Sequence, residues 1–136
     1  MKIVQKDFTV HTKNRTEMID ITDRIESIIR DSGVANGVVT VYCPHTTAAI
    51  TINENADRSV VHDILLSLDE LVPRLRPAYR HSEGNSDAHC KSSIIGCSRD
   101  VLVKDASLVL GTWQGIFFCE FDGPRTRTVI VQTRGL

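Results

Sequence analysis

Residues 115–133, GIFFCEFDGPRTRTVIVQT, contain two apolar segments on either side of a polar turn. The segments 115–121 and 127–133 are rich in β-branched and aromatic residues, which is typical of β-strands. Between them, Asp122-Gly123-Pro124 is a strong turn signal, because these residue types favour tight backbone turns. The stretch therefore predicts two strands joined by a turn near the C-terminus.

The first of these segments carries one acidic residue among apolar ones. Because side chains alternate between the faces of a strand, Phe117, Cys119 and Phe121 share one face, and Glu120 lies on the other. A buried carboxylate is costly unless an arginine or a metal ion pairs with it. We therefore expect a cationic partner for Glu120.

Similar patterns predict strands at 2–12, 37–43, 48–54, 100–105 and 107–111. A first helix is predicted at 17–33, since isoleucines recur at helical spacing and Gly33 can end it. Asp57 can cap a second helix that ends before Pro73. Ser86 or Asp87 can cap a short third helix up to Gly96. The order predicts one domain, 1–136, of the α+β class, with an antiparallel β-sandwich-like sheet and two main helices.

Composition excludes several functional classes. The chain has 136 residues and a net charge of −1, so it lacks the basic field of a nucleic-acid-binding protein. No apolar run is long enough to span a membrane, and the N-terminus lacks the apolar stretch of a signal peptide. The four cysteines form no C-x-x-C pair. We therefore predict a cytoplasmic protein that binds neither nucleic acid nor membrane.

The stretch 79–96, YRHSEGNSDAHCKSSIIG, concentrates acid–base and ligand chemistry. His81, Glu83, Asn85, Asp87 and His89 occupy alternate positions, so in an extended loop they share one side. Imidazole and carboxylate groups are typical Zn²⁺ ligands, although this spacing matches no named zinc motif. Alternatively, the N-terminus of the short helix, with Lys91, favours a phosphate, or the stretch is a solvated loop with a capped helix.

Two further polar groups flank predicted strands. His45, Thr46 and Thr47 follow Pro44, and a polar group from Asn53 to Asp57 precedes the second helix. Such residues suit an anion or a metal, or are simply an edge histidine and a helix cap. Arg125 and Arg127 bind a phosphate or form a solvated hairpin tip. We expect Trp113 to pack in the core.

Three blocks in order, HTTAAITINENAD (45–57), RHSEGNSDAHCKSSIIG (80–96) and LGTWQGIFFCEFDGPRTR (110–127), resemble the YjbQ family, also called the secondary thiamine-phosphate synthase family. The resemblance spans nearly the whole chain. It implies a small α+β fold, a homotrimer, and a secondary activity that joins a pyrimidine pyrophosphate to a thiazole phosphate.

The resemblance also implies a site assembled from all three blocks. The expected metal ligands, for a divalent ion such as Zn or Mg, are His45, His81 and His89. The expected catalytic residues are His45, Asp87 and Glu120. The expected substrate- and phosphate-binding residues are Thr46, Thr47, Asn53, Glu54, Asn85, Lys91, Ser93 and Arg125.

Two other functions fit the same residues. A histidine–carboxylate site can activate water and hydrolyse a small phosphorylated metabolite. A trimer that binds a metal or metabolite without turnover is also compatible with the sequence, although the residue inventory favours chemistry.

Overall fold

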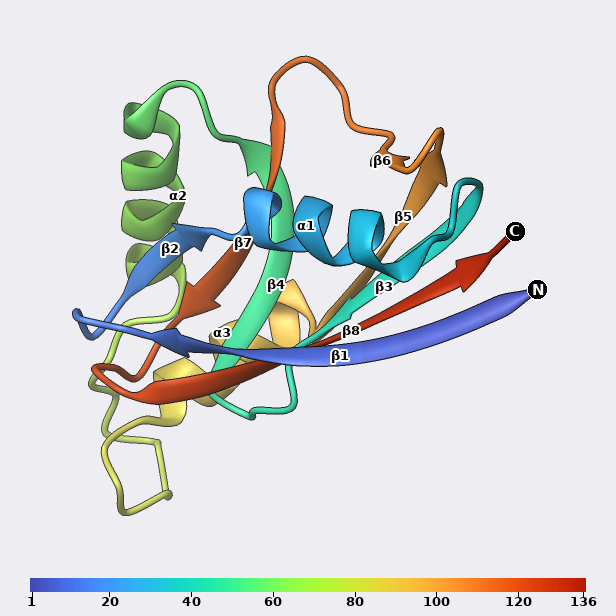
Figure 1. The fold of residues 1–136 in the computed structure, drawn as a ribbon. Coiled ribbons are helices and arrows are strands. Elements are labelled where there is room, and N and C mark those ends of the chain that lie inside the picture. Colours follow the sequence, from blue (N-terminus) through green and yellow to red (C-terminus); the bar gives the residue numbers. More distant parts are fainter.

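The computed structural model describes residues 1–136 and contains eight strands and three helices (Figure 1). The strands are β1 (Lys2–His11), β2 (Glu17–Asp20), β3 (Gly37–Tyr42), β4 (Ala48–Glu54), β5 (Ser98–Lys104), β6 (Ser107–Leu108), β7 (Gln114–Glu120) and β8 (Thr126–Gly135). The helices are α1 (Thr22–Ser32), α2 (Arg58–Leu71) and α3 (Ser86–Ile95). The predicted α+β class is confirmed.

The strands form two antiparallel sheets. The larger sheet has the order β1-β8-β3-β5-β6, and the smaller has the order β2-β7-β4. Lys2 pairs with Gly135 at the end of the β1–β8 ladder, so the two chain ends lie side by side (Figure 1). Apolar side chains from both sheets, including Val39, Val131 and Phe118, form the core between them.

Strand β7 is buried on both faces, which explains its nearly continuous apolar sequence. Ile116 and Phe118 face the core between the sheets, whereas Phe117, Cys119 and Phe121 belong to a second apolar cluster. That cluster includes Leu68 of α2 and Ala88 of α3. The predicted division of β7 into two faces is therefore confirmed.

Two helix ends agree with the prediction, whereas α3 begins after Asn85 and neither Ser86 nor Asp87 caps it. Gly33 follows α1 in the left-handed conformation, with φ of 74°. Asp57 caps α2 by accepting a hydrogen bond from the backbone N–H of Ser59, and α2 ends two residues before Pro73. No helix is both long and apolar enough to cross a membrane.

Three local predictions are wrong. Glu17–Asp20 forms strand β2 against the edge of β7, so the first helix begins only at Thr22. β7 and β8 lie in different sheets, so Asp122-Gly123-Pro124 is a connection between sheets and not a hairpin tip. Trp113 is 61% exposed, in the loop before β7.

Two connections between the sheets run side by side and position the candidate site. Residues 43–47 lead from β3 to β4, and residues 121–125 lead from β7 to β8. They meet because β4 and β7 are antiparallel neighbours, with Ala48 opposite Glu120. The Phe121 N–H donates to the Thr47 carbonyl, which ties one connection to the other.

Candidate functional site

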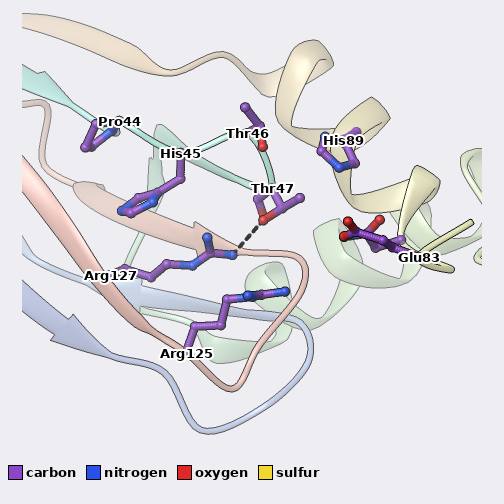
Figure 2. A pocket seen from close by; sticks show the side chains of 9 residues that line it. Pro44, His45, Thr46, Thr47, Glu83, His89, Arg125 and Arg127 are labelled. Carbon is purple, nitrogen blue, oxygen red and sulfur yellow. Dashed lines mark hydrogen bonds between the residues drawn. The ribbon is translucent and has the colours of Figure 1, made fainter. Parts of the chain in front are cut away.

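A cavity of about 330 Å³ lies beside these two connections. Figure 2 shows that Arg125 and Arg127 extend into this region from the 121–127 segment, with His45 and Thr47 close by and His89 on α3 facing them. The lining residues are Pro44, His45, Thr46, Thr47, Glu83, Asn85, His89, Arg125 and Arg127. The structure thus brings together residues from all three polar blocks of the sequence.

Arg127 is held by a buried ion pair with Glu120. Arg127 is 5% exposed and Glu120 is fully buried. The Nε and Nη2 groups of Arg127 donate to the two carboxylate oxygens, and Nη2 also donates to Thr47 Oγ1 at 2.8 Å (Figure 2). Nη1 makes no hydrogen bond within the chain. One edge of the guanidinium is therefore fixed by Glu120, and Nη1 remains free to bind a ligand.

Glu120 is ionised in this arrangement. Burial raises the pKa of Glu120, but hydrogen bonds from Arg127, the Asp122 N–H and Thr12 outweigh burial and hold this pKa below its ordinary value. Glu120 does not line the cavity. Glu120 was expected to be catalytic, but in this structure it positions Arg127. Arg127 is the cationic partner that was expected for Glu120.

Arg125 is held in a similar way at the mouth of the cavity. Its Nε donates to the Asp122 carbonyl and its Nη2 donates to Asp122 Oδ2 at 2.8 Å. The Asn85 amide donates to the same carboxylate oxygen. Burial raises the pKa of Asp122, yet hydrogen bonds from Asn85 and Arg125 lower it overall. Asp122 therefore orients one exposed cation and one buried amide toward the same cavity.

Asn85 begins α3 without capping it by its side chain. Because a carboxylate can only accept, the Asn85 amide nitrogen must face Asp122, and its Oδ1 faces away. This Oδ1 is buried and has no partner in the chain.

His45 is fixed in one neutral tautomer. The Thr128 N–H donates to His45 Nε2 at 2.9 Å, so Nε2 carries no proton and Nδ1 does. Burial and the Arg127 guanidinium lower the pKa of His45, which favours this neutral form. His45 therefore offers an Nδ1–H donor and is not a free general base.

The residues do not fit the predicted three-histidine metal site. No group of three or more His, Cys, Asp or Glu side chains lies close enough to hold a metal ion. The rings of His81 and His89 meet edge to face, with centroids 5.3 Å apart, but His45 has one nitrogen engaged and the other protonated. These three histidines therefore do not form a site for a divalent ion.

Asp87 and Lys91 belong to a separate buried network. Arg15 binds both carboxylate oxygens of Asp87 at 3.0 Å. Lys91 is 1% exposed, and its Nζ lies 2.5 Å from Asp69 Oδ1 and 3.6 Å from Asp87 Oδ2. Burial raises the pKa of Asp87, but Arg15 and Lys91 lower it overall. Neither Asp87 nor Lys91 lines the cavity, so we no longer assign them to catalysis or phosphate binding.

Asn53 and Glu54 lie at the opposite end of β4. At about 3.3 Å per residue, Glu54 is about 20 Å along the strand from Ala48. The Asn53 side chain accepts a hydrogen bond from the Glu54 N–H. Within one chain the structure therefore does not bring these two residues to the cavity.

Ser93 lines a second cavity, of about 390 Å³, which adjoins the first. The two cavities share His45, Thr46 and His89. The remaining residues of the second cavity are Ser92, Ser93, Gly96 and Cys97.

Arg127 and Glu83 are absent from the expected site residues, although the sequence offers Arg127 as one alternative for binding phosphate and Glu83 as one of the alternating polar residues before α3. Alternation along β8 carries a usable signal, because Arg127, Val129 and Val131 share one face. The burial of this face between the sheets brings Arg127 to Glu120. The position of Glu83 depends on the path of the loop before α3, for which the sequence has no comparable signal.

Comparison with known proteins agrees with this fold and length. The family model described as UPF0047 protein YjbQ-like matches residues 6–136. The UPF0047 protein YugU of Bacillus subtilis is 52% identical over 130 residues, covering 96% of this chain and 98% of that protein. A UPF0047 protein of Methanocaldococcus jannaschii is 53% identical over 128 residues, covering 94% of this chain and 92% of that protein.

Solved structures show the same architecture. A crystal structure from Sulfolobus solfataricus, described as a YbjQ-like protein of unknown function, has a TM-score of 0.95 at 37% identity and covers 99% of both chains. A YjbQ/UPF0047 family protein from Clostridium acetobutylicum has a TM-score of 0.93 at 48% identity, covering 95% of this chain and 99% of that one. The chain therefore belongs to the YjbQ/UPF0047 family.

Proposed function

We propose that the cavity binds the phosphate group of a small phosphorylated metabolite. The observation that carries this proposal is the pair of arginines, each held along one edge by a carboxylate, beside the Nδ1–H of His45. Planar guanidinium groups match phosphate oxygens in geometry and charge. The hydroxyls of Thr46 and Thr47 supply further donors.

The reaction that we propose is the joining of a pyrimidine pyrophosphate to a thiazole phosphate. The bond between the pyrimidine-bearing carbon and the pyrophosphate oxygen breaks, and a bond to the thiazole nitrogen forms. Pyrophosphate leaves with the bonding electron pair. This chemistry requires alignment of two rings and stabilisation of the leaving anion, and no covalent help from the enzyme.

The chain's own residues have separate roles in this scheme. Arg125 and Arg127 bind oxygens of the departing pyrophosphate, and His45 donates to it from Nδ1. Glu120 and Asp122 hold the two guanidinium groups in place and do not contact the substrate. The homotrimer that the resemblance implies is also part of this proposal. The physiological role of the activity belongs to the proposal as well.

The test combines both substrates with purified protein and quantifies the joined product by mass spectrometry. We expect product in the wild type and a loss of at least about tenfold for Arg125→Met, because one charged hydrogen bond contributes about 1.5–3 kcal/mol. Ser107→Ala is a matched control, since Ser107 lies on the distant strand β6. Equal rates for wild type and Arg125→Met would overturn the synthase proposal.

Hydrolysis of a single phosphorylated metabolite is a second candidate, favoured by one observation. Glu83 lines the same cavity as the arginines, and its carboxylate is exposed and lies 3.8 Å from His81 Nε2. An exposed carboxylate beside a phosphate-binding group can act as a general base toward water. Release of phosphate from one substrate alone, abolished by Glu83→Gln, distinguishes hydrolysis from synthesis. A binding-only protein shows ligand-induced stabilisation without turnover of any substrate.

A further inference from the structure

The cavity that we assign to phosphate has an uncharged neighbour. The first cavity contains the charged side chains Glu83, Arg125 and Arg127. The second contains no Asp, Glu, Lys or Arg. Because His45, Thr46 and His89 line both, the two cavities form one continuous surface with a charged and an uncharged half.

The two serine hydroxyls that line only the uncharged half already donate hydrogen bonds within the protein. Ser92 Oγ donates to the Ala48 carbonyl at 2.7 Å, and Ser93 Oγ donates to the His89 carbonyl at 3.0 Å. These hydroxyls have used their only protons, so they offer no donor to an anion. The uncharged half is therefore suited to an organic group and not to a second phosphate.

A glycine forms part of this wall. Gly96 ends α3 with φ of +98°, a conformation that residues with a side chain rarely adopt. A Cβ at Gly96 would lie 3.1 Å from Nη1 of Arg99, so the glycine allows the Arg99 side chain to pack against this turn. The volume of about 390 Å³ lies within the range of about 300–1,000 Å³ of small-molecule sites.

We infer that the two cavities are one bipartite site, which holds the phosphate of a phosphate ester in the charged half and its uncharged ring in the uncharged half. The inference rests on the proposed function, because it takes the charged half as the phosphate site. It adds the place of the organic group, which is the ring of a phosphorylated small cyclic compound. Residues His45, Thr46 and His89 lie at the junction, where the ring joins the phosphate.

The chain contains its own reporter for this inference. Cys97 is exposed and lines only the uncharged half, whereas Cys90 is exposed and lines neither cavity. Cys43 and Cys119 are buried. Alkylation by iodoacetamide, followed by peptide mass spectrometry, measures the rates at Cys97 and Cys90 in the same sample.

The experiment compares inorganic phosphate with phenyl phosphate on the full chain, after calorimetry has measured both dissociation constants. At ten times the dissociation constant, phenyl phosphate should slow alkylation of Cys97 about tenfold, since about nine-tenths of the sites are occupied. It should leave Cys90 unchanged. Inorganic phosphate should bind without slowing either cysteine.

A second variant tests the same point without relying on thiol chemistry. Ser93→Trp fills the uncharged half, and it should abolish the affinity advantage of phenyl phosphate over inorganic phosphate. Cys90→Trp places the same bulk at an exposed position of α3 that lines neither cavity, and it should preserve that advantage.

The outcomes separate the two proposals. If phenyl phosphate binds while Cys97 reacts at its free rate, or if inorganic phosphate protects Cys97 equally, the bipartite site is overturned and the phosphate site stands. If neither anion binds, the proposed function fails, and the inference falls with it.

Discussion

Replacing Arg127 with methionine, R127M, removes the cation that neutralises a fully buried carboxylate. Glu120 is 0% exposed, and in the variant it retains only the donors of Thr12 and the Asp122 N–H. Removing one partner of a buried ion pair costs about 3–5 kcal/mol, because the remaining charge is left without compensation. Over 136 residues, an unfolding entropy of about 2.1 cal/mol/K per residue converts this into a fall of about 10–17 °C in Tm.

The assay measures urea unfolding and phosphate binding in parallel for the wild type and two variants. R127M should lose both stability and phosphate affinity. The double variant E120Q/R127M removes the buried charge while keeping an acceptor for Thr12, so it should regain at least about half of the lost stability. It should not regain phosphate affinity, because Nη1 of Arg127 is absent.

Two results would refute this reasoning. A loss below about 1 kcal/mol in R127M would show that Glu120 does not depend on Arg127. Phosphate binding by E120Q/R127M at wild-type affinity would show that Arg127 acts only on the fold.

Three further predictions concern charge and metal. The stability that Glu120 contributes should be fully present above about pH 4.5 and lost as the pH falls below it, because its folded pKa lies below its ordinary value. In R127M, burial should outweigh the remaining hydrogen bonds from Thr12 and the Asp122 N–H and raise the pKa of Glu120, so urea unfolding should show a smaller deficit at pH 5 than at pH 7.5. Lys91→Met should lower stability by about 1–3 kcal/mol in urea unfolding, while calorimetry shows phosphate affinity within about twofold of wild type, since Lys91 binds Asp69. EDTA should leave phosphate affinity unchanged in the same titration, because His45 has no nitrogen free for a metal; a loss restored by Zn²⁺ would contradict this.

Much of the fold follows from the sequence because its patterns are local. Alternation in β7 predicts both its faces, and Asp57 and Gly33 mark helix ends by side-chain and backbone chemistry that acts over a few residues. Pairing between strands is not local. The sequence of Glu17–Asp20 continues a helical pattern, but the open edge of β7 makes it a strand.

The sequence predicts which segments contribute residues to the candidate site, but it does not predict how these residues are arranged in space. His45, Thr47, Asn85, His89 and Arg125 meet because two connections cross between the sheets at the same end of β4 and β7. The sequence does not specify which strands share a sheet, so it cannot reveal that crossing.

The roles of charged residues depend on the same geometry. Asp87 and Lys91 are two to six positions from Asn85 or His89 in the chain, yet the turn of α3 directs them to Arg15 and Asp69. Glu120 was expected to be a catalytic residue, and its inward position on β7 makes it the support of Arg127. Helical and strand periodicity decide which neighbours in sequence become neighbours in the site.

The most direct measurement is a calorimetric titration of pyrophosphate into wild type, Arg125→Met and Arg125→Lys. Arg125 is exposed, so its replacement should leave Tm unchanged. Loss of one charged hydrogen bond of about 1.5–3 kcal/mol should weaken binding about 10- to 150-fold in Arg125→Met, with Arg125→Lys in between. Wild-type affinity in Arg125→Met would contradict the assignment of this cavity to phosphate.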